Sequence, residues 1–305
     1  MIKNKGLAPI VLFTYCRLTN TKETVEHLKK NAEAIDSDLI IYSDAPKNEK
    51  AVESVNKTRE YIHTISGFKS IKIIEREKNW GLAKSIVDGV TSVVNQYGRV
   101  IVLEDDISVS PYFLRYMNEG LERYEGREDI ISLVGYMFPH EETLPEAFLI
   151  KGAECWGWGT WKRGWDIFSF DAQSLYDKIM KAHLTKEFDF NYSYPYLDML
   201  KRQIDGSAGS WAVCWYASAF LDNKYTVYPN KSLVQLNDIF IRGGATHSST
   251  SSKFFVEMSN QPLNWDLADV ESECLQGRRS MEMFFNSIKS KKRRLYDILM
   301  KVIRE

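Results

Sequence analysis

The sequence predicts an α/β fold: a Rossmann-like, mostly parallel sheet with helices on both faces and an irregular second half. In the first 130 residues, short apolar runs of strand length alternate with longer segments of helical periodicity. Polar or acidic clusters follow three of these runs, at the sheet edge where ligands bind in parallel sheets. The chain has 305 residues, of which 44% are hydrophobic, enough for one large domain or two interlocked halves.

The apolar runs predict strands at residues 9–15, 39–42, 71–75 and 100–103. Helices are expected between and after them, at residues 21–34, 49–66, 82–97 and 111–124. Beyond residue 130 this alternation fades, and Gly, Trp and Tyr become dense. We therefore expect three parts: residues 1–130, a pocket-building part at 131–275, and a basic C-terminal helix at 276–305.

Composition excludes several classes of protein. The formal net charge of -1 gives no indication of a nucleic-acid partner. The four cysteines are far apart and form no CxxC pair, so neither a zinc site nor a disulfide framework is expected, and a reducing cytoplasm fits. The apolar run after Lys5 is too short for a signal peptide and contains Pro9. No stretch approaches the roughly 18 apolar residues of a membrane span.

Three carboxylates, Glu104, Asp105 and Asp106, directly follow the fourth predicted strand. Adjacent carboxylates repel one another, and a hard divalent cation such as Mn²⁺ or Mg²⁺ would relieve that repulsion. Such a cation also neutralises a diphosphate leaving group. A solvated acidic turn is the alternative interpretation of this cluster.

Asn79, Trp80 and Gly81 precede a predicted helix, whose N-terminus is a natural anion site. Lys84 lies in the first turn of that helix, where a cation opposes the helix dipole, so we expect it to face phosphate unless it is merely solvated.

Two features of the second half are candidates for binding. Trp156, Trp158 and Trp161 crowd a glycine-rich segment, and Trp158 is the ring we expect to stack on a sugar in the pocket. His247 follows two glycines and would complete a metal site or bind diphosphate once a loop closes, although a lone histidine is more often structural.

Residues 102–113, Val-Leu-Glu-Asp-Asp-Ile-Ser-Val-Ser-Pro-Tyr-Phe, resemble the metal-site segment of GT-A glycosyltransferases of the N-acetylglucosaminyltransferase I type and their bacterial capsule and lipopolysaccharide relatives. The resemblance extends in order along the chain to residues 13–17, 42–44, 79–85, 155–161, 209–215, 228–234 and 244–247.

The resemblance implies roles for individual residues. Asp106 would be the direct metal ligand, with Glu104 and Asp105 facing the donor sugar and ribose. Asp44 would contact the base, and Arg17 the nucleotide. Donor-binding positions in the same segments are Thr14, Tyr15, Asn79, Gly81 and Lys84. An Asx turn is the alternative for Asp44 and a surface charge for Arg17.

The catalytic base is not evident from the sequence. An inverting transferase needs a carboxylate to deprotonate the acceptor hydroxyl, and the family places it near the segment that contains Trp211. Its usual positions hold Gly209 and Ala212 here. Asp205 is the nearest carboxylate and our choice; Asp238, or a catalytically weakened protein, are the alternatives. Trp211 is expected to line the acceptor site.

The sequence therefore predicts an inverting, metal-dependent glycosyltransferase that moves a sugar from a nucleotide sugar, a UDP-sugar in the first instance, to a glycan or lipid-linked glycan of a bacterial surface polysaccharide. A nucleotidyltransferase and a non-catalytic sugar-binding protein are the alternatives. The basic C-terminal helix would either dock on the inner face of the membrane or lie solvated.

Overall fold

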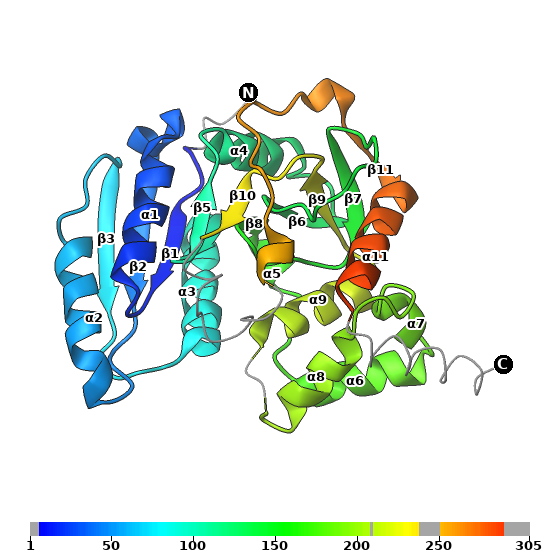
Figure 1. Ribbon diagram of the computed structural model, residues 1–305, viewed down its shortest axis with the longest axis horizontal. Coiled ribbons are helices and arrows are strands. Elements are labelled where there is room, and N and C mark those ends of the chain that lie inside the picture. The colour runs from blue at the N-terminus through cyan, green and yellow to red at the C-terminus, as the bar shows by residue number, and fades with distance from the viewer. Residues whose placement is uncertain (1–5, 208–209, 238–250, 290–305) are drawn as a thin grey trace.

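A nine-stranded mixed sheet forms the centre of the computed structural model, which describes residues 6–207, 210–237 and 251–289 (Figure 1). The strand order is β11-β7-β9-β6-β8-β4-β1-β2-β3. The strands are β1 (Ile10–Thr14), β2 (Asp38–Ser43), β3 (Ser70–Glu75), β4 (Arg99–Glu104), β6 (Ile130–Val134), β7 (Ala147–Lys151), β8 (Trp158–Trp161), β9 (Tyr225–Pro229) and β11 (Asp269–Glu273). This architecture confirms the predicted α/β class and is consistent with a GT-A fold.

The N-terminal part is a run of four parallel strands, β3-β2-β1-β4, connected by helices. These helices are α1 (Leu18–Lys29), α2 (Glu49–Ile62) and α3 (Leu82–Tyr97), and α4 (Phe113–Arg123) follows β4. Every element predicted here is present. The first helix begins three residues earlier than the expected Thr21, and a 3₁₀ turn at Ala32–Asp36 replaces its predicted end.

The apolar side chains of β1 divide between two cores. Ile10 and Leu12 pack on one face of the sheet with residues of α1 and α4. Val11 and Phe13 pack on the other face with α3. Because both faces are covered here, the first four residues of β1 form an uninterrupted apolar run, as is usual for buried parallel strands.

Strand β8 joins the two halves of the molecule. It lies between β4 and β6 and is antiparallel to both, with Trp158 opposite Val102 of β4. Gly157 precedes it with φ of 62°, and a Cβ there would lie 2.7 Å from Val234 Cγ2. Only glycine combines this left-handed backbone with so close an approach.

A second, two-stranded sheet lies beside the end of β4. Strands β5 (Ile107–Val109) and β10 (Val234–Leu236) pair antiparallel, side by side in the middle of Figure 1. Beyond this pair, the backbone N–H of Asn237 donates to the Asp106 carbonyl over 2.9 Å. A segment more than a hundred residues away in sequence therefore borders the carboxylate cluster.

The second half carries the remaining helices, most of which gather below the sheet in Figure 1. They are α5 (Lys162–Trp165), α6 (Ala172–Lys181), α7 (Thr185–Phe188), α8 (Tyr196–Ile204), α9 (Trp211–Leu221) and α11 (Leu275–Ile288). Helix α11 packs Met281, Phe284 and Phe285 into the core. The basic residues 291–294 of the expected C-terminal helix lie outside the described residues. None of the described helices has the length and apolar character needed to cross a bilayer.

Candidate active site

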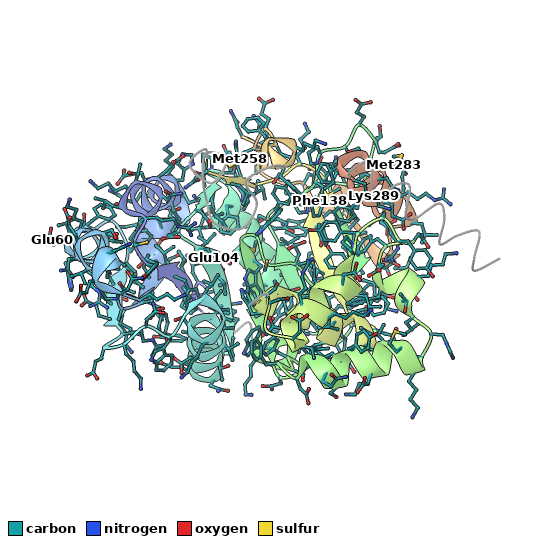
Figure 2. The ribbon with its side chains drawn as sticks, turned by 60° about the horizontal axis from the view of Figure 1, so that its bottom comes forward. Glu60, Glu104, Phe138, Met258, Met283 and Lys289 are labelled. Carbon is teal, nitrogen blue, oxygen red and sulfur yellow. The ribbon has the colours of Figure 1, made fainter. Side chains whose placement is uncertain are left out.

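Arg17 and the carboxylate cluster face each other at the carboxyl ends of β1 and β4. The Arg17 Nη1 atom donates to Asp106 Oδ2 over 2.8 Å, and its Nε atom donates to Asp105 Oδ1 over 3.1 Å. Figure 2 shows Glu104 in the middle of the molecule, between the N-terminal elements and the second half. Neighbouring parallel strands end at one edge of a sheet, which is why segments 85 residues or more apart meet here.

Burial and mutual repulsion shift the protonation equilibria of the cluster. Desolvation, reinforced by the charge of Asp106, raises the pKa of Glu104 to about 8. Burial raises the pKa of Asp105 to about 6, although Arg17 opposes that shift. The charges of both aspartates raise the pKa of Arg17 against the effect of its own burial. Among the described residues, the Arg17 guanidinium thus balances part of the negative charge of the two aspartates.

Hydrogen bonds from other residues of the protein hold the Asp105 carboxylate in place. Besides Arg17, its Oδ2 atom accepts from the backbone N–H of Tyr15 at 3.4 Å and from the Thr21 hydroxyl at 3.5 Å. The Asp105 backbone carbonyl accepts from Thr24. Only 2% of Asp105 is exposed. Asp105 therefore fixes the loop after β1, and its predicted contact with ribose stays a prediction.

The cluster suits a cation that takes part of its ligands from substrate. Within the described part of the chain, no three His, Cys, Asp or Glu side chains form a complete metal-binding set. Mg²⁺ and similar ions usually need only one or two protein carboxylates, with phosphate oxygens and water completing the shell. Asp106 and Glu104, whose charges repel each other, fit that incomplete set.

Asp44 organises the donor-side loop instead of presenting a free carboxylate. Its Oδ1 atom accepts from the backbone N–H of Ala45 and of Trp80, each over 2.9 Å. Its Oδ2 atom accepts from Asn79 Nδ2 at 3.0 Å and from the Gly81 N–H at 2.8 Å. A carboxylate has about four acceptor positions, and all are used. The predicted contact of Asp44 with a base stays a prediction, and it would have to share these acceptor positions.

Two cationic side chains lie against a tryptophan ring in the loop that Asp44 holds. The Arg76 guanidinium lies 3.9 Å from the Trp80 ring centroid, and Lys84 Nζ lies 4.3 Å from it. Gly81, with φ of 74°, begins α3 directly after this ring. The sequence drew attention to Lys84 and Gly81 but missed Arg76, which lies just beyond β3. The predicted phosphate contact of Lys84 stays a prediction.

Thr14 and Tyr15 complete the loop after β1. The Thr14 side chain is 4% exposed, and its Oγ1 atom has no hydrogen-bond partner among the described residues. The Tyr15 hydroxyl accepts from the Lys47 backbone N–H over 3.0 Å. Tyr15 thus ties the loop after β1 to the loop after β2, and the donor contacts predicted for both residues stay predictions.

Trp158 and Trp211 belong to the core, which corrects their expected contact with an acceptor. Trp158 is 0% exposed and Trp211 is 3% exposed, and their ring centroids are 5.7 Å apart. Trp165 and Trp215 pack on them from the same side of the sheet. Trp158 lies within β8 and is buried, while Trp156, two residues earlier and outside the strand, is partly exposed. The sequence could not separate these rings because it does not show at which residue the strand begins.

A cavity of about 130 Å³ opens beside Trp156. Its lining is mainly aromatic, with Glu154 and Ser210 as polar members. The remaining lining residues are Phe138, Ala153, Cys155, Tyr194, Tyr196, Met199, Ala212, Val213, Tyr216, Phe254 and Phe285. Glu154 was missed from the sequence, although a single charge among Ala153, Cys155 and Trp156 was a signal.

The predicted base, Asp205, lies at the exposed C-terminal end of α8. Its Oδ1 atom accepts from the Ser207 N–H over 2.8 Å, and hydrogen bonds from Ser207 lower its pKa. A lowered pKa makes a weaker base. None of its contacts with other described residues connects Asp205 with the carboxylate cluster. The alternative base Asp238 and the predicted metal ligand His247 lie outside the described residues.

Residues 10–142 match the family model described as "Glycosyl transferase family 2". This segment, just under half of the chain, contains Arg17, Asp44 and the carboxylate cluster. The match supports a glycosyltransferase with a nucleotide-sugar-binding GT-A domain. No curated protein sequence matches the chain.

Three of the solved structures that resemble the chain are the following. One is a mannosyltransferase, PcManGT, from Pyrobaculum calidifontis in complex with GDP-Man and Mn²⁺ (10% identity, 44% of this chain and 36% of that chain, TM-score 0.31). Another is TarS from S. aureus (14% identity, 46% of this chain and 23% of that chain, TM-score 0.31). A third is the structure of S. aureus TarS 1-349 (15% identity, 46% of this chain and 41% of that chain, TM-score 0.32). The chain covers less than half the length of each.

Proposed function

We propose that this protein is an inverting, metal-dependent glycosyltransferase that moves a hexosyl or N-acetylhexosaminyl group from a UDP-sugar to a glycan acceptor of a bacterial surface polysaccharide. The observation that carries the proposal is the meeting of Arg17 with Asp105 and Asp106 at the ends of β1 and β4. The family match over residues 10–142 covers this site. The resemblance to transferases of the N-acetylglucosaminyltransferase I type supports the finer assignment.

The residues divide into three tasks. Asp106, with Glu104 beside it, would hold Mn²⁺ or Mg²⁺. When bound, that ion would neutralise charge on the departing diphosphate. Arg17 is within reach of the same anion once it leaves Asp106, because a guanidinium pairs equally well with phosphate and carboxylate. Lys84 and Arg76 add positive charge at the start of α3, where the helix N-terminus also favours an anion.

A nucleotidyltransferase is the second candidate, and the structure of the first loop disfavours it. Such enzymes hold triphosphate on a glycine-rich, basic loop after the first strand. Here Arg17 directly precedes α1, and Tyr15, Cys16 and Arg17 are the whole connection. A three-residue connection without glycine provides no cradle of backbone N–H groups.

Calorimetric titration tests the proposal. UDP and UDP-sugars are titrated with and without Mn²⁺ into the wild type, Asp106→Asn, and Asp177→Asn, an exposed control on α6. We expect binding that requires the metal, falls at least tenfold in Asp106→Asn, and is unchanged in Asp177→Asn. Mn²⁺-dependent hydrolysis of a UDP-sugar would also exclude a catalytically inactive protein. Absence of binding by UDP-, GDP- and CMP-sugars alike would overturn the proposal.

The acceptor is proposed to be a glycan or a lipid-linked glycan at the cytoplasmic face of the membrane. The observation behind the membrane contact is the sequence of the C-terminal segment, where basic and apolar residues interleave. Co-sedimentation of the protein with vesicles containing 30% anionic lipid tests it. Equal binding to neutral vesicles, or none, would remove this part of the proposal.

A further inference from the structure

The cavity beside Trp156 has the chemistry of a sugar site. Its walls are rings from several separate segments, including Trp156, Tyr194, Tyr196 and Phe254, and rings of this kind pack on the apolar faces of sugars. Its polar groups, the Glu154 carboxylate and Ser210, lie on the same lining. This combination of an apolar wall with few polar groups is typical of small-molecule sites.

Glu154 is half-buried, and among the described residues no cation pairs with it. Burial raises its pKa, and only hydrogen bonds from Cys155 oppose the shift. No ion pair to Glu154 occurs within the described residues. The titratable groups that face it are Cys155 and the tyrosines Tyr136, Tyr194, Tyr196 and Tyr228, whose own pKa values are raised. A carboxylate in such surroundings costs stability, so its presence favours a functional role.

The segment that carries Glu154 runs alongside the carboxylate cluster. Strand β8 is antiparallel to β4 with Trp158 opposite Val102, so the residues before Trp158 approach the residues after Val102. The charges of Glu104 and Asp106 both act on the thiol of Cys155, which follows Glu154 in the chain and also lines the cavity. The cavity and the proposed donor site are therefore neighbours.

We propose that this cavity binds the terminal sugar of the acceptor and that Glu154 accepts the proton of its attacking hydroxyl. The inference rests on the proposed function. As the acceptor oxygen bonds to C1 of the donor sugar, its proton passes to Glu154, and the C1–O bond to the diphosphate breaks. The nucleoside diphosphate leaves with that electron pair. Glu154 takes the place that the sequence assigned to Asp205.

The size of the cavity limits what enters it. At about 130 Å³, it is smaller than the roughly 300 Å³ of most ligand pockets. It therefore accommodates one sugar ring, and the rest of the acceptor stays outside the mouth. The cavity selects the terminal residue of the acceptor, not the glycan behind it.

The test separates binding from chemistry with two variants. Glu154→Gln keeps the shape of the side chain and removes the base. Ala212→Leu, in the first turn of α9, fills the cavity. Binding of methyl glycosides of glucose, galactose and N-acetylglucosamine is measured by saturation-transfer NMR with UDP and Mg²⁺, and UDP-sugar hydrolysis by release of UDP.

We expect Glu154→Gln to bind UDP and a methyl glycoside within threefold of the wild type but to hydrolyse UDP-sugars at least 100-fold more slowly. Ala212→Leu should bind UDP normally and lose the glycoside. Glu122→Gln, an exposed change on α4, should match the wild type in both measurements.

The assignment of the base would be overturned if Glu154→Gln hydrolysed UDP-sugars at more than a tenth of the wild-type rate, or if Asp205→Asn instead lost 100-fold in that rate. The assignment of the cavity would be overturned if the wild type bound no methyl glycoside, or if Ala212→Leu still bound one. Failure of the proposed function looks different, because the wild type would then bind no nucleotide, a measurement that does not involve Glu154.

Discussion

The Arg17 guanidinium and the Asp106 carboxylate form an ion pair, joined by a 2.8 Å hydrogen bond, at the position proposed for a divalent cation. Arg17 also pairs with Asp105, and about a third of its side chain is exposed. A metal ion that binds Asp106 must therefore displace a cation that is already there. This competition couples metal binding to nucleotide binding, because the diphosphate gives the displaced guanidinium a new anion.

Arg17→Ala should strengthen Mn²⁺ binding in the absence of nucleotide. Removal of a partly buried ion pair worth about 1 kcal/mol corresponds to roughly a fivefold gain in affinity. The same variant should bind UDP more weakly. Free Mn²⁺, measured by electron paramagnetic resonance, reports the first effect, and calorimetry the second.

Arg115→Ala is the matched control, since Arg115 is exposed on α4 and pairs only with its helix neighbour Glu119. It should change neither affinity. Equal Mn²⁺ affinity in Arg17→Ala and wild type would show that the guanidinium does not compete with the metal.

Asp44→Ala should destabilise the fold more than it alters nucleotide preference. The variant leaves the N–H groups of Ala45, Trp80 and Gly81 without their acceptor, at a cost of roughly 2–4 kcal/mol in unfolding free energy. Urea denaturation measures that loss. If Asp44 instead contacts the base, the ratio of UDP to GDP affinity would shift and stability would hardly change.

Two tryptophans two residues apart should respond differently to truncation. Trp158→Ala removes a fully buried ring and should cost about 3–5 kcal/mol. Trp156→Ala removes a partly exposed ring on the cavity wall and should cost about 1–2 kcal/mol while abolishing methyl glycoside binding. Thermal denaturation and the NMR titration together distinguish them; similar stability losses would contradict the assignment of Trp158 to the core.

The rate of UDP-sugar hydrolysis should depend on pH through the ionisation of Glu154. A base works only when ionised, and burial raises the pKa of this carboxyl above its usual 4.5. Activity should therefore be present above that raised pKa and be lost as the pH falls through it. Rates measured from pH 4 to pH 9 in the wild type should show this acid limb. The residual rate of Glu154→Gln should lack it; a limb that persists there belongs to another group.

The sequence was a good guide where local pattern decides structure. Alternation of apolar runs and helices placed β1 to β4 to within one residue at each end and predicted the presence of α1 to α4, although α1 and α2 end four to five residues earlier than predicted. The acidic cluster was found because it directly follows a predicted strand. It failed where partners come from distant segments. The four acceptor positions of Asp44 are filled from residues 45 and 79–81, and the segment of Cys155 comes near the cluster only because β8 lies against β4. No local pattern contains either pairing.

Antiparallel pairing of β5 with β10 links residues 107–109 to residues 234–236, directly beyond the carboxylate cluster. Closing so large a loop is a late and entropically costly step in folding. During synthesis, Asp106 cannot reach its final surroundings until the chain has emerged past residue 237. A ribosome-bound chain that ends before β10 would thus display strands β1 to β4 without a finished binding site, and nucleotide affinity would arise abruptly once β10 has emerged.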